Sequence, residues 1–509
     1  MRASSMPRAG GRARPRFAAG VTVVLGIQLL ALLVGAAALG TWQDEEYTLA
    51  TTAHGVAYAF HRALDYELQA PLYFVIVAAL RSASDAVFVA RAFSVCCAVA
   101  FVYAATAIAR RIVPARAVWP FAALVAINPF TIFAALEIRV YALALLLAAL
   151  GWLTFEDGFW RGADRRARLA FAALAIVSLY TQYFIAFEFV AFAVGLAIVR
   201  RWAALRAYAV VGVVVALAFA PMLPLLHGQI GGAVGVHDAR PPSLARVLVH
   251  PALDFVLPLD FQARSGVAGR IVAIAIALAL LVATIVGRPR FDRQLLAYAG
   301  IATTIEAIYV VLARGLHYEL VAPRHYFALA LPEFVVAFAI IARLYGTRAR
   351  VATATIVALL GAAAIASDVT IYGAGAKAGD WPRVGAYLTR VSKPGDTIAI
   401  DEADAIPSFE RYYRGSARIV AFPRPLATDR YDLTAMIVRS RAEAEAALAR
   451  LPRTGRLWFV DYGICDRSDR LGCLETHAAL ARRERVLQRV GFYENAVLRI
   501  EPVAVPTVP

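Results

Sequence analysis

The sequence predicts a polytopic α-helical membrane protein with about 11 transmembrane helices (roughly 11 to 13) and a small C-terminal α/β domain outside the membrane. The composition is the first reason: 61% of the 509 residues are hydrophobic, 17% are charged and the mean hydropathy is +0.64, far more apolar than a soluble domain. The second reason is a series of long apolar runs, separated by short arginine clusters. The third is a change near Lys377 to polar sequence in which strand-like and helix-like runs alternate.

The first apolar run, from about Ala18 to Gly40, follows an arginine-rich segment. A signal-peptide core is only about 7 to 15 residues long, so this longer run is predicted to be a retained anchor. The piece from Pro71 to Leu80 is too short to span and is predicted to be an interfacial or re-entrant helix. Further runs long enough to cross about 30 Å of hydrocarbon lie near residues 85–109, 117–136, 140–155, 168–183, 184–199, 205–226, 267–287, 294–313, 325–342 and 351–371.

The arginine clusters predict the topology, because cytoplasmic segments are enriched in basic residues. Opposite segments hold few basic residues for their length, so the N terminus is predicted to be cytoplasmic and the C-terminal domain to lie outside. The clusters fall in segments 1–17, 110–116, 156–168, 200–206, 288–293 and 343–350. The predicted divisions are a cytoplasmic segment 1–17, a membrane domain 18–371 with exterior loops 41–84, 227–266 and 314–324, and a soluble exterior domain 377–509.

Composition and missing motifs narrow the function. The net charge of +16 is explained by topology and predicts no nucleic-acid partner, because the arginines sit in short clusters between apolar runs. The sequence has no P-loop, HExxH or paired CxxC, and no GxGxxG follows a strand in the tail, which disfavours nucleotide-driven transport and a bound dinucleotide. No cofactor is assigned, although a divalent metal is compatible with the acidic residues. Richness in Ala and Arg suggests a high-GC genome and a bacterial cytoplasmic (inner) membrane.

The exterior domain is predicted from alternating runs. Strands are expected at Asp396–Ile400, Arg418–Phe422, Arg456–Asp461 and Asn495–Ile500, with helices near 382–391 and 440–450. Cys465 and Cys473 are a candidate disulfide if this domain faces an oxidising compartment. Asp401, Glu402 and Asp404 follow a strand and either border a site or form a solvated loop.

The first candidate site follows the anchor, where Asp44, Glu45 and Glu46 are three consecutive carboxylates beside Trp42 and Tyr47. Adjacent like charges favour an upward-shifted pKa or a bound cation. The alternative is a solvated loop that ends a helix, with the two aromatic residues as interfacial anchors.

Other candidates stand at predicted span ends on the same face. An acid and a base without a long loop, Glu137 and Arg139, predict either a polar cavity or a local ion pair. Arginines near the tenth span either bind a lipid phosphate or extend to lipid headgroups. The candidate substrate-binding residues are Glu67, Gln69, Tyr73, Glu137, Arg139, Tyr141, Arg314, His317, Arg324, His325 and Tyr326.

The order of these motifs carries a resemblance. An anchor precedes Asp44-Glu45 with Tyr47-Thr48, Pro71-Leu72-Tyr73, Glu137-x-Arg139-x-Tyr141 and Arg324-His325-Tyr326 with Pro332, and the tail opens with Asp380-Trp381. This order resembles the polyprenyl-phosphate-dependent membrane glycosyltransferases of the GT-C type. Within that class the chain is similar to the glycosyltransferase 39 group, which includes protein O-mannosyltransferases, and to lipid A aminoarabinose transferases. The resemblance covers roughly residues 15 to 371 and, more weakly, the tail.

The resemblance implies a GT-C-like fold and a division of catalytic labour. The family's acidic pair matches Asp44, as the base that deprotonates the acceptor, and Glu45, which orients the acceptor or assists Asp44. The family often has His-Pro-Pro-Leu-Tyr where this chain has Gln69-Ala70-Pro71-Leu72-Tyr73. Glutamine does not titrate, so the acid/base or metal role of that histidine is not carried over to Gln69.

The resemblance also implies the substrates. A sugar on polyprenyl phosphate would enter from the outer leaflet, an acceptor hydroxyl of a glycan, lipid or protein would attack with inversion, and arginine would stabilise the leaving lipid phosphate. Membrane lipids are the other expected partners. Two alternatives are a transporter or flippase of lipid-linked sugars and a non-catalytic scaffold whose tail binds envelope partners.

Overall fold

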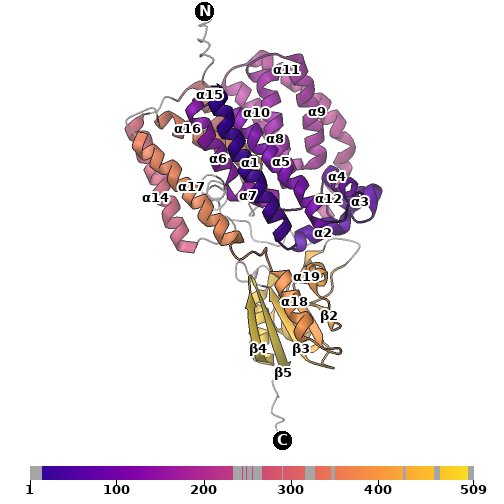
Figure 1. The fold of residues 1–509 in the computed structure, drawn as a ribbon. Coiled ribbons are helices and arrows are strands. Elements are labelled where there is room, and N and C mark those ends of the chain that lie inside the picture. Colours follow the sequence, from indigo (N-terminus) through magenta and orange to yellow (C-terminus); the bar gives the residue numbers. More distant parts are fainter. Residues whose placement is uncertain are drawn as a thin grey trace, which may run out of the picture.

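The computed structural model describes residues 14–232, 244, 248, 255, 266–288, 291–315, 327–345, 350–427, 432–462 and 471–502. A large helical body carries a smaller domain at one end, and the chain enters the body at the opposite end (Figure 1). The helices of the body are α1 (Arg14–Ala38), α2 (Gln43–Thr51), α3 (Gly55–Asp65), α4 (Leu72–Arg81), α5 (Val87–Ala109), α6 (Ala115–Ala126), α7 (Pro129–Leu136), α8 (Tyr141–Phe155), α9 (Arg165–Thr181), α10 (Ala186–Ile198), α11 (Trp202–Phe219), α12 (Leu223–Gly232), α14 (Gly266–Gly287), α15 (Arg293–Gly315), α16 (Phe327–Leu344) and α17 (Arg350–Tyr372).

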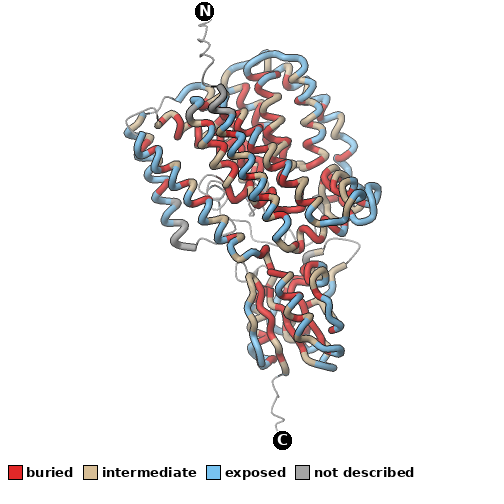
Figure 2. The backbone as a smooth tube through the Cα atoms, in the orientation of Figure 1, coloured by how far each residue is buried: buried red, intermediate tan, exposed pale blue. Residues whose placement is uncertain are grey.

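The body is a polytopic membrane domain. Among the described residues, seven helices are long and apolar enough to cross a membrane, and eight if the bent pair α6 and α7 counts as one span. The other predicted spans correspond to helices α9, α10 and α14, the last two of which contribute shorter apolar stretches. Helices α1, α11 and α14 expose large aliphatic side chains, such as Leu30, Val214 and Leu278, as expected of surfaces that face lipid. Figure 2 shows the buried residues gathered inside the body.

The predicted span 117–136 is broken in the middle. Helices α6 and α7 meet at an angle of 50°, because Asn128 and Pro129 start a new helix there. The side chain of Asn128 accepts a hydrogen bond from the backbone N–H of Phe130 at 3.0 Å and caps α7, with Pro129 in the first turn. The end of α7 consequently leads into Glu137 and the start of α8.

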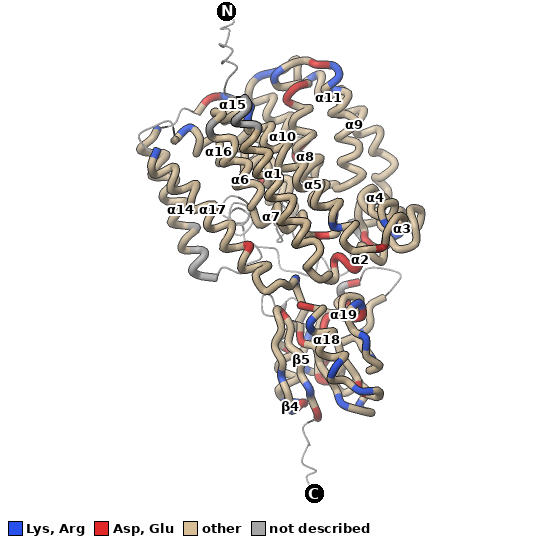
Figure 3. The backbone as a smooth tube through the Cα atoms, in the orientation of Figure 1, with Lys and Arg blue, Asp and Glu red and all other residues tan. Residues whose placement is uncertain are grey.

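The arginine-rich connections gather at the end of the body away from the C-terminal domain (Figure 3). Arg343 at the end of α16 pairs with Asp292 before α15 at 2.7 Å, and Arg111 after α5 pairs with Asp157 at 2.7 Å. Arg161 donates to the backbone oxygen of Arg111 at 2.8 Å. These contacts join connections that the charge pattern assigns to one side, although which side is cytoplasmic stays a prediction.

The predicted exterior loop 41–84 is mostly helical, with α2, α3 and α4 inside it. The short apolar piece after Pro71 forms α4, ten residues long, which buries Tyr73, Phe74, Val77 and Ala78. Most of the predicted loop 227–266, and residues 316–326, lie outside the described residues.

The C-terminal domain is a five-stranded sheet in the order β2-β1-β3-β5-β4, with helices on both faces. Strands β1, β2 and β3 are parallel, whereas β5 pairs antiparallel with β3 and β4. Its elements are α18 (Trp381–Val391), β1 (Thr397–Asp401), α19 (Ile406–Tyr412), β2 (Arg418–Phe422), α20 (Arg441–Ala449), β3 (Leu457–Tyr462), α21 (Cys473–Arg483), β4 (Glu484–Phe492) and β5 (Asn495–Pro502).

Side-chain alternation along the strands creates two cores. In β3, Phe459 packs with α20 and α21, whereas Trp458 and Val460 face α18 and α19. The four predicted strands and two predicted helices all form, with ends shifted by only a residue or two. Helices α19 and α21 and strand β4 were not predicted, and α19 proves important for the site.

Asp396 fastens the start of β1 to β3. Its carboxylate accepts hydrogen bonds from the backbone N–H groups of Lys393 and Arg456, from the Arg456 guanidinium and from the indole of Trp458. Burial raises the pKa of Asp396, but the Lys393 amide and the Arg456 side chain lower it by more than burial raises it. The pKa of Asp396 therefore lies below its ordinary value. The ionised form is therefore the one that the fold stabilises.

We expect Asp396→Asn to destabilise the C-terminal domain by roughly 1–3 kcal/mol, because charge-assisted hydrogen bonds to a buried carboxylate are lost. The rate of proteolytic cleavage in the domain of the full chain measures the effect. Since the folded-state pKa is lowered, the difference from the parent should be full at neutral pH and shrink below about pH 4. Glu501→Gln removes a more exposed partner of Arg485 in the same domain and should change little; equal effects of both would contradict the role of Asp396.

Candidate active site

Helix α2 lies where the helical body meets the C-terminal domain (Figure 1). It begins at Gln43, five residues after α1 ends at Ala38, and carries Asp44, Glu45 and Glu46 in its first turn. Carboxylates are favourable there because the N-terminus of a helix carries partial positive charge. Apart from this, the first turn is held by side chains from distant parts of the chain.

Glu45 is held by Arg91 of α5, and both side chains are fully buried. The Arg91 guanidinium donates to both carboxylate oxygens of Glu45, at 3.1 and 2.9 Å. It also donates to the backbone oxygens of Ala36, Leu39 and Gly40 at 3.0, 2.7 and 2.9 Å. All five N–H groups of the guanidinium are thereby used. Arg91 thus satisfies the carbonyls that the end of α1 leaves without partners and ties them to α2.

Lys377, in the connection between α17 and α18, completes this buried cluster. Its ammonium lies 2.8 Å from Glu45 and 3.1 Å from Glu137, and it donates to the backbone oxygen of Leu136. Burial raises the pKa of Glu45, but Lys377 and Arg91 lower it more, so Glu45 is ionised. For Glu137 burial prevails: its pKa rises to about 7 despite Lys377 and the hydrogen bond from Trp42. We call Glu45, Arg91, Glu137 and Lys377 the junction cluster.

Arg139 holds the other side of α2. Its Nη1 atom lies 3.2 Å from the backbone oxygen of Asp44, 3.1 Å from the Thr48 hydroxyl and 3.3 Å from Glu67. Glu67 also accepts a hydrogen bond from Thr51 at 2.8 Å. The pair Glu137 and Arg139, predicted as either a local ion pair or part of a polar cavity, instead divides between two networks that both fix α2.

The C-terminal domain binds α2 from the remaining side. Tyr462 of β3 donates to Gln43 at 3.0 Å, and Arg411 of α19 pairs with Glu46, with one contact at 2.8 Å. The hydroxyl of Tyr412 accepts from the backbone N–H of Thr41 at 2.8 Å. The approach is close, since a Cβ atom at Gly40 would lie 2.5 Å from Cγ of Pro382. A side chain at position 40 would therefore push the two domains apart.

Asp44 differs from its neighbours. Gln43, Glu45 and Glu46 are buried and bonded to other elements, whereas Asp44 alone among residues 43 to 46 keeps partial solvent exposure. Its backbone is fixed through Arg139 and the hydrogen bond from Thr48. The arrangement presents a carboxylate at the junction on a rigid helix turn, which is what a general base needs.

The predicted site residues thus separate into groups. Asp44, Glu45, Glu67, Glu137 and Arg139 come together, with Tyr141 beside Arg139. The other described candidates are placed differently: Tyr73 is 1% exposed in the core, Gln69 accepts from Gln229 through its backbone oxygen, and Arg314 is exposed at the end of α15. His317, Arg324, His325 and Tyr326 lie outside the described residues.

Cys473 is disulfide-bonded, Cys96 and Cys97 are free thiols, and Cys465 lies outside the described residues. Within the described part of the chain, no three His, Cys, Asp or Glu side chains converge closely enough to hold a metal ion.

Several residues of the junction were not predicted to belong to a site. Arg91 and Lys377 are separated from Glu45 by 46 and about 330 positions, so no local motif marks them. The signal available was that a charge beside an apolar run needs a buried partner.

The acidic turn after β1 is also not a solvated face: Asp401 and Glu402 are 5% and 4% exposed. Burial and nearby Asp461 raise the pKa of Asp401 to about 7.

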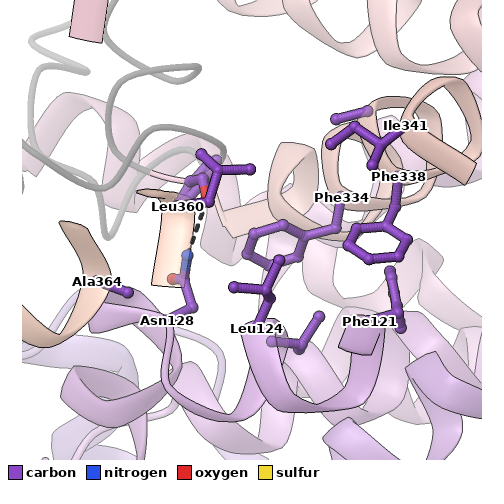
Figure 4. Close-up of a pocket in the computed structure, with 11 residues that line it drawn as sticks. Phe121, Leu124, Asn128, Phe334, Phe338, Ile341, Leu360 and Ala364 are labelled. Atoms are coloured by element: carbon purple, nitrogen blue, oxygen red, sulfur yellow. Dashed lines mark hydrogen bonds between the residues drawn. The ribbon is translucent and has the colours of Figure 1, made fainter. Parts of the chain in front are cut away.

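An apolar pocket opens between α6, α16 and α17 (Figure 4). The pocket is small and open to its surroundings, and Asn128, whose amide donates to the backbone oxygen of Phe255 at 2.7 Å, is its polar residue. The lining is Phe121, Leu124, Val125, Asn128, Phe255, Phe334, Ala337, Phe338, Ile341, Leu360 and Ala364. Helix α7 runs from this pocket to Glu137 and, with eight residues, is about 12 Å long.

We expect Lys377→Met to destabilise the full chain by about 3–5 kcal/mol, because two buried carboxyls would then share one cation. Adding Glu137→Gln removes the excess negative charge, so the double variant should recover much of the loss. Thermal unfolding of the detergent-purified protein measures both. Lys393→Met, outside the junction, is the matched control. Equal unfolding temperatures of single and double variants would show that charge balance is not what Lys377 supplies.

Comparisons with known proteins give a distant likeness. No protein-family model matches the chain, and neither does any curated protein. Among solved structures, it is similar to the crystal structure of ArnT from Cupriavidus metallidurans bound to undecaprenyl phosphate, with a TM-score of 0.43 and 13% identity over 94% of this chain and 97% of that one. It is also similar to ArnT from Cupriavidus metallidurans in the apo state, with a TM-score of 0.42 and 14% identity over 95% and 98% of the two chains. The functional proposal therefore rests on the residues of this chain.

Proposed function

We propose that the chain is a membrane glycosyltransferase that moves a sugar from a polyprenyl-phosphate-linked donor to an acceptor hydroxyl, with Asp44 as the general base. The observation that carries the proposal is that Asp44, alone among residues 43 to 46, keeps partial solvent exposure on a helix turn that distant parts of the chain fix in place. The reaction would take place at the outer face of a bacterial cytoplasmic membrane, where the domain junction would lie.

The chemistry requires no nucleotide. The acceptor oxygen attacks the anomeric carbon and forms the new C–O bond, while the bond from that carbon to the phosphate oxygen breaks and its electron pair leaves with the lipid phosphate. Asp44 takes the acceptor proton. A single direct displacement inverts the anomeric centre. A positioned base contributes about 10²- to 10⁴-fold to such a reaction.

The donor's two parts need different surroundings. The prenyl chain is apolar, and the pocket between α6, α16 and α17 offers it an aromatic and aliphatic lining within the membrane body. The phosphate needs cations, for which Arg314, Arg324, His317 and His325 remain candidates. Arg139 is already engaged with Glu67 and α2, so we assign it to positioning the base.

Glu45 takes a positioning role in this proposal. Its carboxylate oxygens bind Arg91, Lys377 and the backbone N–H of Ile138, at 3.0 Å for the last. A carboxylate with that many partners is unsuited to accept a further proton. It supports Asp44 by fixing the turn of α2 on which Asp44 stands.

We expect Asp44→Asn to lower kcat by about 10²- to 10⁴-fold with little change in donor binding, because the amide keeps the shape but accepts no proton. The assay supplies purified protein with a panel of polyprenyl-phosphate sugars and follows release of polyprenyl phosphate. Asp85→Asn, an exposed acid on the predicted exterior segment, is the matched control and should match the parent.

The other outcomes of this assay distinguish the transferase from the alternative functions. Equal donor consumption by the parent and Asp44→Asn would remove Asp44 from catalysis. Absence of donor consumption by the parent, together with accumulation of untransported lipid-linked sugar in cells that lack the protein, would favour a flippase. A scaffold would keep its cellular role when Asp44 is replaced.

A further inference from the structure

The C-terminal domain brings a second carboxyl to Asp44. Asp404 stands in the short turn η6 (Ala403–Ala405), which follows β1 and leads directly into α19. Helix α19 packs on α2, and residues at its end bind the chain on both sides of Asp44: Tyr412 at Thr41 and Arg411 at Glu46. Together with the hydrogen bond from Tyr462 to Gln43, these contacts fix the position of the turn relative to α2.

Asp404 as a whole is half-buried at this junction, but one of its carboxylate oxygens is enclosed. Its Oδ1 atom is inaccessible to solvent and has no hydrogen-bond partner among the described residues. Burial and the charge of Asp44 raise the pKa of Asp404 to about 7. Glu402, two residues before Asp404, has a φ of +61°, a conformation that costs energy in a residue other than glycine and persists where the surroundings enforce it. The turn is therefore held in place at some cost.

We propose that Asp404 is a positioning residue of the reaction centre, which pairs with Asp44 and shares a proton with it. This inference rests on the proposed function, in which Asp44 is the base. Two neighbouring carboxyls do not both ionise readily, so one proton is retained between them. The protonated Asp404 donates a hydrogen bond that orients the ionised Asp44, and Asp44 then takes the proton of the acceptor hydroxyl as the glycosidic bond forms.

The surroundings of the pair are mainly acidic or phenolic. Asp401 at the end of β1, Tyr462 of β3 and Tyr66 after α3 interact with it, and Glu402 interacts with Tyr462. Of the nearby cations, Arg411 pairs with Glu46 and Arg62 stacks 3.7 Å from the centre of the Tyr66 ring. Arg139 pairs with Glu67 and also interacts with the charge of Asp44. With few cations to stabilise it, the doubly ionised pair would repel an anionic lipid-phosphate donor. The active form is the pair with one proton.

The pairing predicts a particular pH profile. The rate of the parent should fall above about pH 7, where the pair loses the one proton that it still shares. In Asp404→Asn the amide still donates a hydrogen bond to Asp44 but has no proton to lose. The variant should therefore lack the decline at high pH, and its rate at pH 6 should stay within roughly tenfold of the parent. A purely structural role would scale the whole profile and leave its shape unchanged.

The experiment measures the rate of sugar transfer from about pH 5 to 9, a range that spans the neutral region in which histidines and raised carboxyls titrate. It uses the full chain in detergent and the donor that the panel shows to be accepted. Glu410→Gln, an exposed acid on α19, is the matched control with the parent profile. Glu137 and Asp401 are other groups whose pKa is raised to about 7, and His477 is a nearby histidine that hydrogen-bonds to Asp461. The variants Glu137→Gln, Asp401→Asn and His477→Gln should each keep the decline.

Loss of the decline in Asp404→Asn alone supports the pair. Three results would overturn the pair. They are a decline that persists in Asp404→Asn, a parent without any decline at high pH, and a decline that is lost in one of the three comparison variants instead. An unfolding temperature equal to that of the parent verifies that Asp404→Asn is correctly folded. The proposed function fails separately, if Asp44→Asn retains the parent's activity; an inactive Asp44→Asn with an unchanged Asp404→Asn profile removes only the pair.

Discussion

The buried contact between Arg91 and Glu45 is the interaction on which the rest of the junction depends. A fully buried guanidinium is stable only when its donors are satisfied, and here it binds a carboxylate and three carbonyls at the end of α1. This fixes where α1 ends and in which direction α2 begins. Because removal of one member leaves an uncompensated charge, the contact specifies geometry more than it adds stability.

The other contacts of α2 follow from that fixed direction. One side of the helix meets Arg139 and Glu67, and the other meets Tyr462 and Arg411 of the C-terminal domain. The C-terminal domain is thus part of the proposed reaction centre and not an appendage. A general base is effective only when its position is maintained to a fraction of an ångström, and here four separate parts of the chain supply that restraint.

Most of the fold follows from patterns that are local in the sequence. Apolar runs predicted the membrane helices, and alternation predicted strands β1, β2, β3 and β5 within a residue or two. The bend at Asn128 was missed because a cap followed by proline within an apolar run looks like one continuous span. Strand β4 was missed because its exposed, charged residues lack a buried face.

The site was predicted in part, for a related reason. Asp44, Glu67, Glu137 and Arg139 were recognisable as charges at the ends of apolar runs, where hydrocarbon makes an unpaired charge costly. Their partners Arg91, Lys377 and Arg411 were not, because pairing across tens or hundreds of residues is decided by the packing of helices. Asp404 stayed ambiguous because a short acidic turn reads the same whether it faces water or another domain.

The position of Lys377 also has a consequence in time. It follows the last membrane helix, so during synthesis Glu45 and Glu137 emerge and meet long before their shared cation exists. Until Lys377 has been synthesised, Glu45 has Arg91 as its cation while Glu137 lacks the ammonium that binds it in the complete junction. The junction cluster can therefore be completed only after α17 has been made.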